Sequence, residues 1–187
     1  PNIHQIREAK SIYLFDRRLK FLINVDSNVN KFYKEYFSCI LSYSAMSIPE
    51  IAADFYQIDD AIRTGYAWSY GPFEIWDNLG IESGVEMIKS CGEEVPNWIN
   101  EMSDSGIKSF YKFEDGKKKF YDVNSKTYIN VPSSENHYIL DAFRENNQIL
   151  KNSECTVHDI GEGVMCIEFH TKGNSIGEGL AKGLNEA

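Results

Sequence analysis

Cysteine and histidine have the widest catalytic and metal-binding chemistry among side chains, and the chain holds four of each. The cysteines are far apart and form no C-x-x-C pair, whereas structural zinc needs clustered thiolates or imidazoles. We interpret them as buried, reduced thiols of a cytosolic protein. No motif beside a histidine places a carboxylate or a nucleophile at a defined distance, which favours surface or hydrogen-bonded histidines. These residues are Cys39, Cys91, Cys155, Cys166, His4, His137, His158 and His170.

A second candidate for chemistry is the segment G-E-G-L-A-K-G at 177–183, which follows a predicted strand and leads into a predicted helix. In dinucleotide-binding folds, such glycines let the backbone approach a pyrophosphate at the helix N-terminus. Here the glycine spacing differs by one from G-x-G-x-x-G, and the strand ends several residues too early. No acidic residue follows about 20 positions later to bind a ribose. We therefore reject a nucleotide site.

The most informative stretch is 58–80, IDDAIRTGYAWSYGPFEIWDNLG. It predicts a short helix, a glycine- and aromatic-rich turn, and a second helix. Asp59 and Asp60 favour a helix N-terminus, and Gly65 is placed to end that helix in a left-handed conformation. Pro72 can open the next helix because its missing N–H would be unpaired there anyway. That second helix is apolar on more than one side, so it is buried or lies against a partner.

Together with S-I-P-E-I-A-A-D-F at 47–55, this stretch resembles the C-terminal helical domain of the 3-hydroxyacyl-CoA dehydrogenases. That domain shows the pattern I-D-x-A-x-x-x-G…G-P-F-E-x-x-D-x-x-G, with many fixed positions at fixed spacing. The matching residues are Ile58, Asp59, Ala61, Gly65, Gly71, Pro72, Phe73, Glu74, Asp77 and Gly80.

A second resemblance lies at 155–177, C-T-V-H-D-I-G-E-G-V-M-C-I-E-F-H-T-K-G-N-S-I-G. It is similar to the opening hairpin and first loop of crotonase-type enoyl-CoA hydratases, which show D-L-G-x-G-V…L-E-F-H-x-K-x-N-x-I where they follow a dehydrogenase in one polypeptide. The two resemblances imply a mainly α domain like the C-terminal domain of 6-phosphogluconate dehydrogenase at 1–123, with a hairpin at about 110–123. They also imply a linker at 124–150 and an incomplete, crotonase-like start at 151–187. The first residue is Pro1 rather than Met, which suggests an internal slice of a longer protein.

The resemblance implies a cytoplasmic parent enzyme of fatty-acid β-oxidation that oxidises L-3-hydroxyacyl-CoA to 3-oxoacyl-CoA with NAD and hydrates 2-enoyl-CoA. In that family NAD and the catalytic His–Glu pair belong to a Rossmann domain, so we expect no catalytic residue, cofactor or metal in this chain. We expect it to pack against the Rossmann domain and the first helical domain of the same polypeptide, or to form a homodimer. The alternative is a scaffold or association module with no ligand of its own.

The aromatic turn would then be a domain-contact surface or a wall of the acyl-chain cleft, and the alternative is the core of the domain itself. Its residues are Tyr66, Trp68, Tyr70, Gly71, Pro72, Phe73 and Trp76. In the crotonase-like segment, Lys172 and Asn174 lie where the family begins to hold the CoA moiety. Two interpretations are open there, a CoA contact by these two residues and a simple turn, and the sequence favours the turn.

The composition agrees with a folded protein that must position these groups. A hydrophobic content of 42% and an aromatic content of 13% can fill a core in 187 residues. The net charge of −9 argues against a nucleic-acid partner. No apolar run approaches the roughly 20 residues that cross a bilayer.

Apolar periodicity predicts helices in the first half of the chain. An approximate stripe covers 3–22, and a clearer one runs from Val29 to Ser44 with Ser27 as its cap, ending near Ile48 before a proline. Further helices are predicted near 81–92 and 96–106.

The second half predicts strands. Phe110–Phe113 and Lys119–Val123 flank Asp115-Gly116, a strong signal for a tight hairpin, and 124–136 is predicted to be a linker. Val157–Ile160 and Val164–Phe169 predict a second hairpin, and a last helix is predicted from about Ile176. Residues 137–147 are ambiguous between helix and strand.

Overall fold

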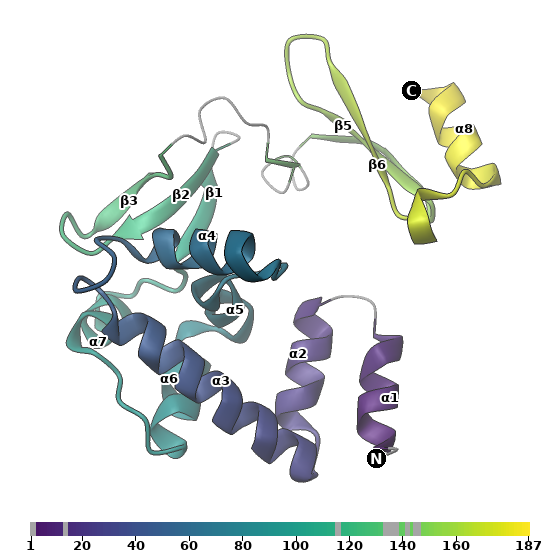
Figure 1. The fold of residues 1–187 in the computed structure, drawn as a ribbon. Coiled ribbons are helices and arrows are strands. Elements are labelled where there is room, and N and C mark those ends of the chain that lie inside the picture. The colour runs from purple at the N-terminus through teal and green to yellow at the C-terminus, as the bar shows by residue number, and fades with distance from the viewer. Residues whose placement is uncertain (1–2, 13–14, 115–116, 133–138, 141–142, 144–146) are drawn as a thin grey trace. The chain divides into compact units, whose positions relative to one another are not determined.

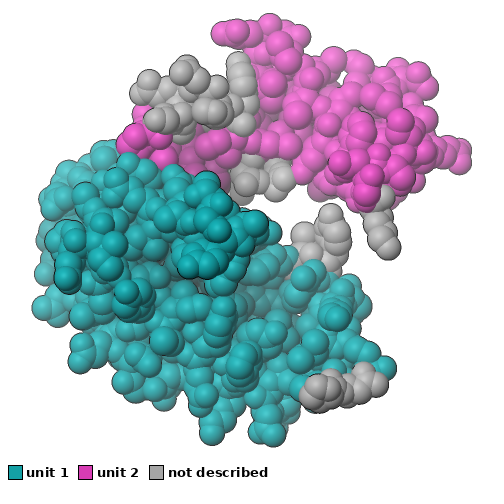
Figure 2. All heavy atoms as spheres, in the orientation of Figure 1, with its two compact units in different colours: residues 1–111, 120–129 teal, residues 112–119, 130–187 magenta. Residues whose placement is uncertain are grey.

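The computed structural model describes residues 3–12, 15–114, 117–132, 139–140, 143 and 147–187. The chain divides into two compact units, drawn in different colours in Figure 2: residues 1–111 with 120–129, and residues 112–119 with 130–187. The helices before the first strand are α1 His4–Ser11, α2 Phe15–Asn24, α3 Asn28–Met46, α4 Phe55–Tyr66, α5 Pro72–Leu79, α6 Ile81–Ser90 and α7 Asn97–Asp104 (Figure 1). The later elements are β1 Tyr111–Glu114, β2 Lys117–Asp122, β3 Thr127–Asn130, β4 Gln148–Lys151, β5 Cys155–Asp159, β6 Met165–Phe169, the 3-10 turn η3 Lys172–Asn174 and α8 Glu178–Glu186.

Helix α3 is the longest element of the first unit and packs against α2, α4, α5 and α6 (Figure 1). Its start confirms the predicted cap, because Ser27 Oγ accepts a hydrogen bond from the Val29 N–H at 3.2 Å. Phe37, Leu41 and Ala45 on one face are buried. The apolar period of the sequence thus identified both the helix and its core side.

The predicted stripe over 3–22 forms two helices, α1 and α2, instead of one. Ala9 of α1, Leu22 of α2 and Val29 of α3 form a small buried cluster. Burying one residue from each of the three helices explains how short helices of this kind are stabilised, since isolated helices of this length are marginal in water.

The first hairpin is confirmed by β1 and β2, whereas its turn at Asp115-Gly116 lies outside the described residues. A third strand, β3, follows in the order β1-β2-β3, within residues that the sequence analysis placed in a linker. The linker prediction missed it because β3 is stabilised by distant partners. The Tyr128 hydroxyl donates to the Ser109 carbonyl at 2.6 Å, and its ring packs edge-on against Tyr121 at 5.8 Å.

The second unit contains a three-stranded antiparallel sheet in the order β4-β5-β6. The predicted hairpin is confirmed, with Val157 opposite Ile167. Strand β4 begins at Gln148, again inside the predicted linker, and most of the ambiguous stretch before it lies outside the described residues. Helix α8 confirms the predicted last helix. It packs against β5, and Leu180 of the helix is buried, as are Cys155 and Val157 of the strand.

No helix in the described ranges combines the length and apolarity needed to cross a membrane.

Candidate functional site

Asp59 is the buried centre of the 58–80 stretch. Helix α4 begins at Phe55, where Asp54 and Gln57 form a capping box, so Asp59 lies inside the helix and not at its N-terminus as predicted. Its carboxylate accepts hydrogen bonds from the backbone N–H groups of Phe73 at 2.9 Å and Glu74 at 3.2 Å. Asp59 therefore caps the N-terminus of the next helix, α5, where a negative charge is favoured.

The glycine and glutamate of the G-P-F-E motif complete this junction. A Cβ atom on Gly71 would lie 2.4 Å from Asp59, so only glycine lets the two helices approach this closely. The Gly71 N–H donates to the Glu74 carboxylate at 2.8 Å. Arg63 of α4 binds both Glu74, at 2.5 Å, and Asp60. These contacts explain why the motif joins acidic residues and glycine at fixed spacing.

Tyr111 links the same junction to the sheet. Its hydroxyl donates to Asp59 at 2.7 Å, while Asp77 accepts from the backbone N–H groups of Phe110 at 2.6 Å and Tyr111 at 2.9 Å. Burial, followed by the neighbouring negative charge of Asp59, raises the pKa of Tyr111 well above its ordinary value of 10.0. Asp59, Glu74 and Asp77 are thus engaged in holding helix ends and a strand.

Gly65 does not end helix α4 as predicted. The helix continues through Gly65 to Tyr66, and the next residue, Ala67, adopts the left-handed conformation with φ 54°. The aromatic turn therefore starts two residues later than the sequence indicates.

The structure separates the predicted aromatic residues into two groups. Phe73 and Trp76 are fully buried in the core of the first unit, where Phe73 packs against Phe55 and Phe110 with ring centroids 4.9 and 5.1 Å apart. Gly71 and Pro72 are buried with them. For these four positions the structure shows the core location that the sequence analysis left as the alternative.

Tyr66, Trp68 and Tyr70 form the second group, at the surface. Tyr66 is 74% exposed, Trp68 is half-buried, and Tyr70 is exposed while stacking on Phe15 with ring centroids 4.5 Å apart. Trp68 and Tyr70 line a cavity of about 430 Å³, which we call the aromatic pocket. Its lining residues are Phe15, Arg18, Tyr36, Phe37, Ala67, Trp68, Ser69, Tyr70 and Ile75.

The aromatic pocket combines apolar walls with one cationic side chain among its lining residues. Arg18 is anchored by a hydrogen bond from its Nε to the Ile12 carbonyl at 2.9 Å. Apolar walls with a guanidinium suit an acyl chain or an apolar side chain beside an anionic group. Phe15, Arg18 and Tyr36 were not predicted as site residues, because they lie on α2 and α3 and no local pattern connects them to the turn.

In the second unit, Lys172–Asn174 form the short turn η3. The Asn174 N–H donates to the Thr171 carbonyl at 3.1 Å, and the Thr171 hydroxyl donates to the Ser175 carbonyl at 2.7 Å. The side chain of Lys172 lies outside the described residues. The backbone is a tight turn here, and a CoA contact by Lys172 and Asn174 stays a prediction.

The glycine-rich segment before and within α8 has a structural explanation. The Glu154 carboxylate accepts a hydrogen bond from the Leu180 N–H at 2.8 Å and lies against Gly177 and Gly179, where added Cβ atoms would be 2.5 and 3.1 Å away. A Cβ atom on Gly183 would lie 2.2 Å from Cys155 Sγ. The N-terminus of α8 is thus occupied by a carboxylate of the chain itself, in agreement with the rejection of a nucleotide site.

Neither the histidines nor the cysteines form a metal centre in the described part of the chain, where no group of three or more candidate ligands could hold an ion. His158 pairs with Glu168 at 3.3 Å, and His170 with the Thr156 hydroxyl at 2.7 Å. All four cysteines are free thiols. Cys39 is exposed, which corrects the expectation that all of them are buried.

Comparison with known proteins agrees with the motif. The chain is 34% identical to a "Probable 3-hydroxyacyl-CoA dehydrogenase" of Bacillus subtilis (strain 168), over an alignment of 191 residues that covers 100% of this chain and 24% of the relative. The resemblance to 3-hydroxyacyl-CoA dehydrogenases is thereby confirmed, and it extends across both units. The chain spans about a quarter of the length of this relative.

Two further relatives are each a "Putative fatty acid oxidation complex trifunctional enzyme", from Rickettsia prowazekii (strain Madrid E) and Rickettsia felis (strain ATCC VR-1525 / URRWXCal2). They are 30% and 37% identical over 70 residues, which is 37% of this chain and 10% of each relative. No protein-family model matches the chain, and no solved structure matches it significantly.

Proposed function

We propose that this chain is the helical part of an NAD-dependent 3-hydroxyacyl-CoA dehydrogenase that converts L-3-hydroxyacyl-CoA to 3-oxoacyl-CoA in cytoplasmic fatty-acid β-oxidation. The proposal rests on the contacts of the three acidic motif residues: Asp59 and Glu74 hold the start of α5 beside Gly71, and Asp77 holds the start of β1. The identity to the Bacillus relative over the whole chain supports it. NAD would bind to a Rossmann domain outside this chain.

The role of the chain within this enzyme is to pack against the catalytic part. We propose that residues 1–123 form a domain like the C-terminal domain of 6-phosphogluconate dehydrogenase. The aromatic pocket, with Trp68, Tyr70 and Arg18, would contact the neighbouring domain or the acyl chain. Both uses are supported by its apolar walls and single guanidinium, since CoA esters and acidic side chains are anionic.

We further propose that 124–150 connects this domain to the beginning of an enoyl-CoA hydratase of the crotonase type at 151–187. The hairpin of β5 and β6, followed by the turn η3, supports this assignment, since it places the elements in the order that the resemblance implies. Lys172 and Asn174 would then contribute to holding CoA once the rest of that domain is present.

Calorimetric titration of the chain with acetoacetyl-CoA and with NAD tests the proposal. We expect no heat of binding with NAD alone, because the N-terminus of α8 is already capped by Glu154. Heat with acetoacetyl-CoA that is lost in Trp68→Ala and kept in Tyr43→Ala, an exposed position outside the aromatic pocket, would assign the pocket to substrate. Binding of NAD to the chain alone would contradict the proposal that NAD binds to a domain outside this chain.

The second candidate function is an association module with no ligand of its own. The exposed apolar residues of α3 favour it, because contiguous apolar surface marks interaction sites. The same titration distinguishes the two functions. A chain that binds neither compound, and whose mass in solution rises with concentration, would have the second function.

A further inference from the structure

Helices α1 and α2 form a basic helix pair within an acidic protein. They lie side by side and antiparallel (Figure 1). The two helices contain five lysines and arginines against two acidic residues, a net charge of +3, whereas the whole chain carries −9. A local excess of positive charge of this kind indicates an anionic partner. The cationic residues are Arg7, Lys10, Arg17, Arg18 and Lys20, and the acidic residues are Glu8 and Asp16.

Four cations of the basic helix pair are exposed, namely Arg7, Lys10, Arg17 and Lys20. Lys10 and Arg17 lie next to the connection between the two helices. Arg7 and Lys20 lie about one turn further from it. Because the helices are antiparallel, the two cations at each level lie at a similar height. Glu8 is exposed as well, which leaves a surplus of three positive charges on the surface of the helix pair.

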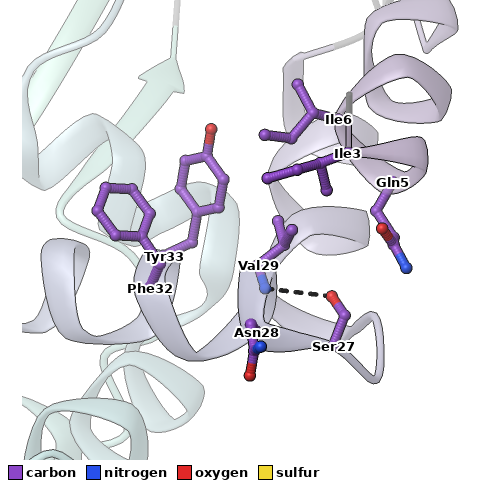
Figure 3. Close-up of a pocket in the computed structure, with 8 residues that line it drawn as sticks. All are labelled: Ile3, Gln5, Ile6, Ser27, Asn28, Val29, Phe32 and Tyr33. Atoms are coloured by element: carbon purple, nitrogen blue, oxygen red, sulfur yellow. Dashed lines mark hydrogen bonds between the residues drawn. The ribbon is translucent and has the colours of Figure 1, made fainter. Parts of the chain in front are cut away.

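An apolar surface adjoins the basic helix pair at the N-terminal end of α1. Ile3 and Ile6 line an open cavity of about 530 Å³ together with Val29 and Phe32 of α3. Figure 3 shows Phe32 and Tyr33 on one side of this cavity and the side chains of Ile3 and Ile6 across from them. Ile3 is 37% exposed and Phe32 is 59% exposed. The residues that line the cavity are all uncharged.

The apolar cavity and the cations share one side of α1. Ile3, Arg7 and Lys10 follow one another at steps of four and three residues, which places them along one stripe of the helix. Apolar side chains beside a row of cations match the boundary between the acyl chains and the anionic head groups of a lipid bilayer. An acidic protein would satisfy the cations, but it would also need a bulky apolar group of defined shape to fill the cavity. Acyl chains are flexible and meet no such requirement.

We propose that the basic helix pair and the cavity at the start of α1 form a docking surface for an anionic lipid bilayer. The exposed cations contact phospholipid head groups, and acyl chains cover the cavity between Ile3 and Phe32. The acidic remainder of the chain permits this contact, because charges are screened beyond about 8 Å at physiological ionic strength. This inference goes beyond the proposed function and needs no substrate in its test, so the two can fail separately.

Co-sedimentation of the full chain with vesicles tests the docking surface. We expect binding to vesicles of phosphatidylserine and phosphatidylcholine in equal parts, and none to phosphatidylcholine alone. The double variant Arg7→Gln, Lys20→Gln should weaken this binding about tenfold or more. The matched control is Lys89→Gln, Lys108→Gln, which changes the net charge equally at exposed lysines outside the helix pair and should bind like the parent chain. No binding to the anionic vesicles, or equal losses in the two double variants, overturns the proposal.

Phe32→Ser tests the apolar part of the surface. It should weaken binding to the anionic vesicles about threefold or more, because it removes apolar area that the bilayer covers. Tyr66→Ser is its control, since Tyr66 is 74% exposed and lies outside the surface. Circular dichroism establishes that every variant is folded. Unchanged binding of Phe32→Ser, or tighter binding of the chain to soluble polyglutamate than to the vesicles, indicates an acidic protein as the partner and overturns the proposal.

Discussion

At the residue scale, Asp59 connects three elements of the first unit, α4, α5 and β1. One buried carboxylate serves two backbone N–H groups of α5 and the hydroxyl of Tyr111, and Gly71 is required for its approach. A charged acceptor of this kind is stable in the interior only because its partners are fixed in place. The aspartate of the motif is therefore a positioning residue for the helix that carries Phe73 and Trp76.

Replacing Asp59 tests this assignment. Asp59→Ala should lower the free energy of unfolding by about 3 to 5 kcal/mol, because it leaves three buried donors without an acceptor. Asp60→Asn is the control, since the Asp60 side chain is 49% exposed, and it should cost less than about 1 kcal/mol. Urea unfolding measures both values. Equal losses in the two variants would contradict the role of Asp59.

Tyr111 makes the same junction sensitive to pH. Its pKa is raised in the folded state, so above pH 10, the ordinary pKa of tyrosine, the unfolded chain releases a proton that the folded chain keeps. The contribution of Tyr111 to stability is therefore complete below about pH 10 and falls by about 1.4 kcal/mol for each further pH unit. Tyr111→Phe should be less stable than the parent chain at neutral pH, and the difference should shrink above pH 10. A difference that stays constant with pH would contradict a raised pKa.

At the scale of elements, the glycines show why local sequence identifies helices better than their ends. Gly65 has the residue type of a helix terminator, yet α4 passes through it and ends with Ala67 in the left-handed conformation. Gly84 lies inside α6, where glycine has a low helix propensity, yet its missing side chain makes room for the indole of Trp76. Whether a glycine ends a helix or admits a neighbour depends on residues that the local sequence does not show.

These two glycines give a paired prediction. Gly84→Ala should destabilise the chain by about 1 to 3 kcal/mol through overpacking, because the added Cβ atom would lie 2.0 Å from Trp76 Nε1. Gly65→Ala should stabilise it by up to about 1 kcal/mol, since nothing lies within 4 Å of its added Cβ atom. Thermal unfolding of both variants measures the effects. The reverse order of stability would contradict the packing of α6 on α5.

At the scale of the whole molecule, the features that could be predicted from the sequence are those that depend on local patterns. The cap and core face of α3, the two hairpins and the last helix follow from apolar period and turn residues. Strand β3 was not predicted, because its Tyr128 is held by contacts with Ser109 and Tyr121. Ser109 is distant in sequence, and no local pattern marks Tyr121 as a partner. The aromatic pocket was found only in part, since Trp68 and Tyr70 belong to the motif but Phe15 and Arg18 come from α2.

We propose that this chain supplies the packing part, and none of the catalytic groups, of a 3-hydroxyacyl-CoA dehydrogenase. The most direct test replaces the matching segment of the Bacillus relative with this chain and measures NAD reduction with an L-3-hydroxyacyl-CoA, using the unaltered relative as reference. We predict that the chimera oxidises the substrate while the isolated chain does not. A folded chimera without NAD-dependent oxidation, or oxidation by the isolated chain, would contradict the account.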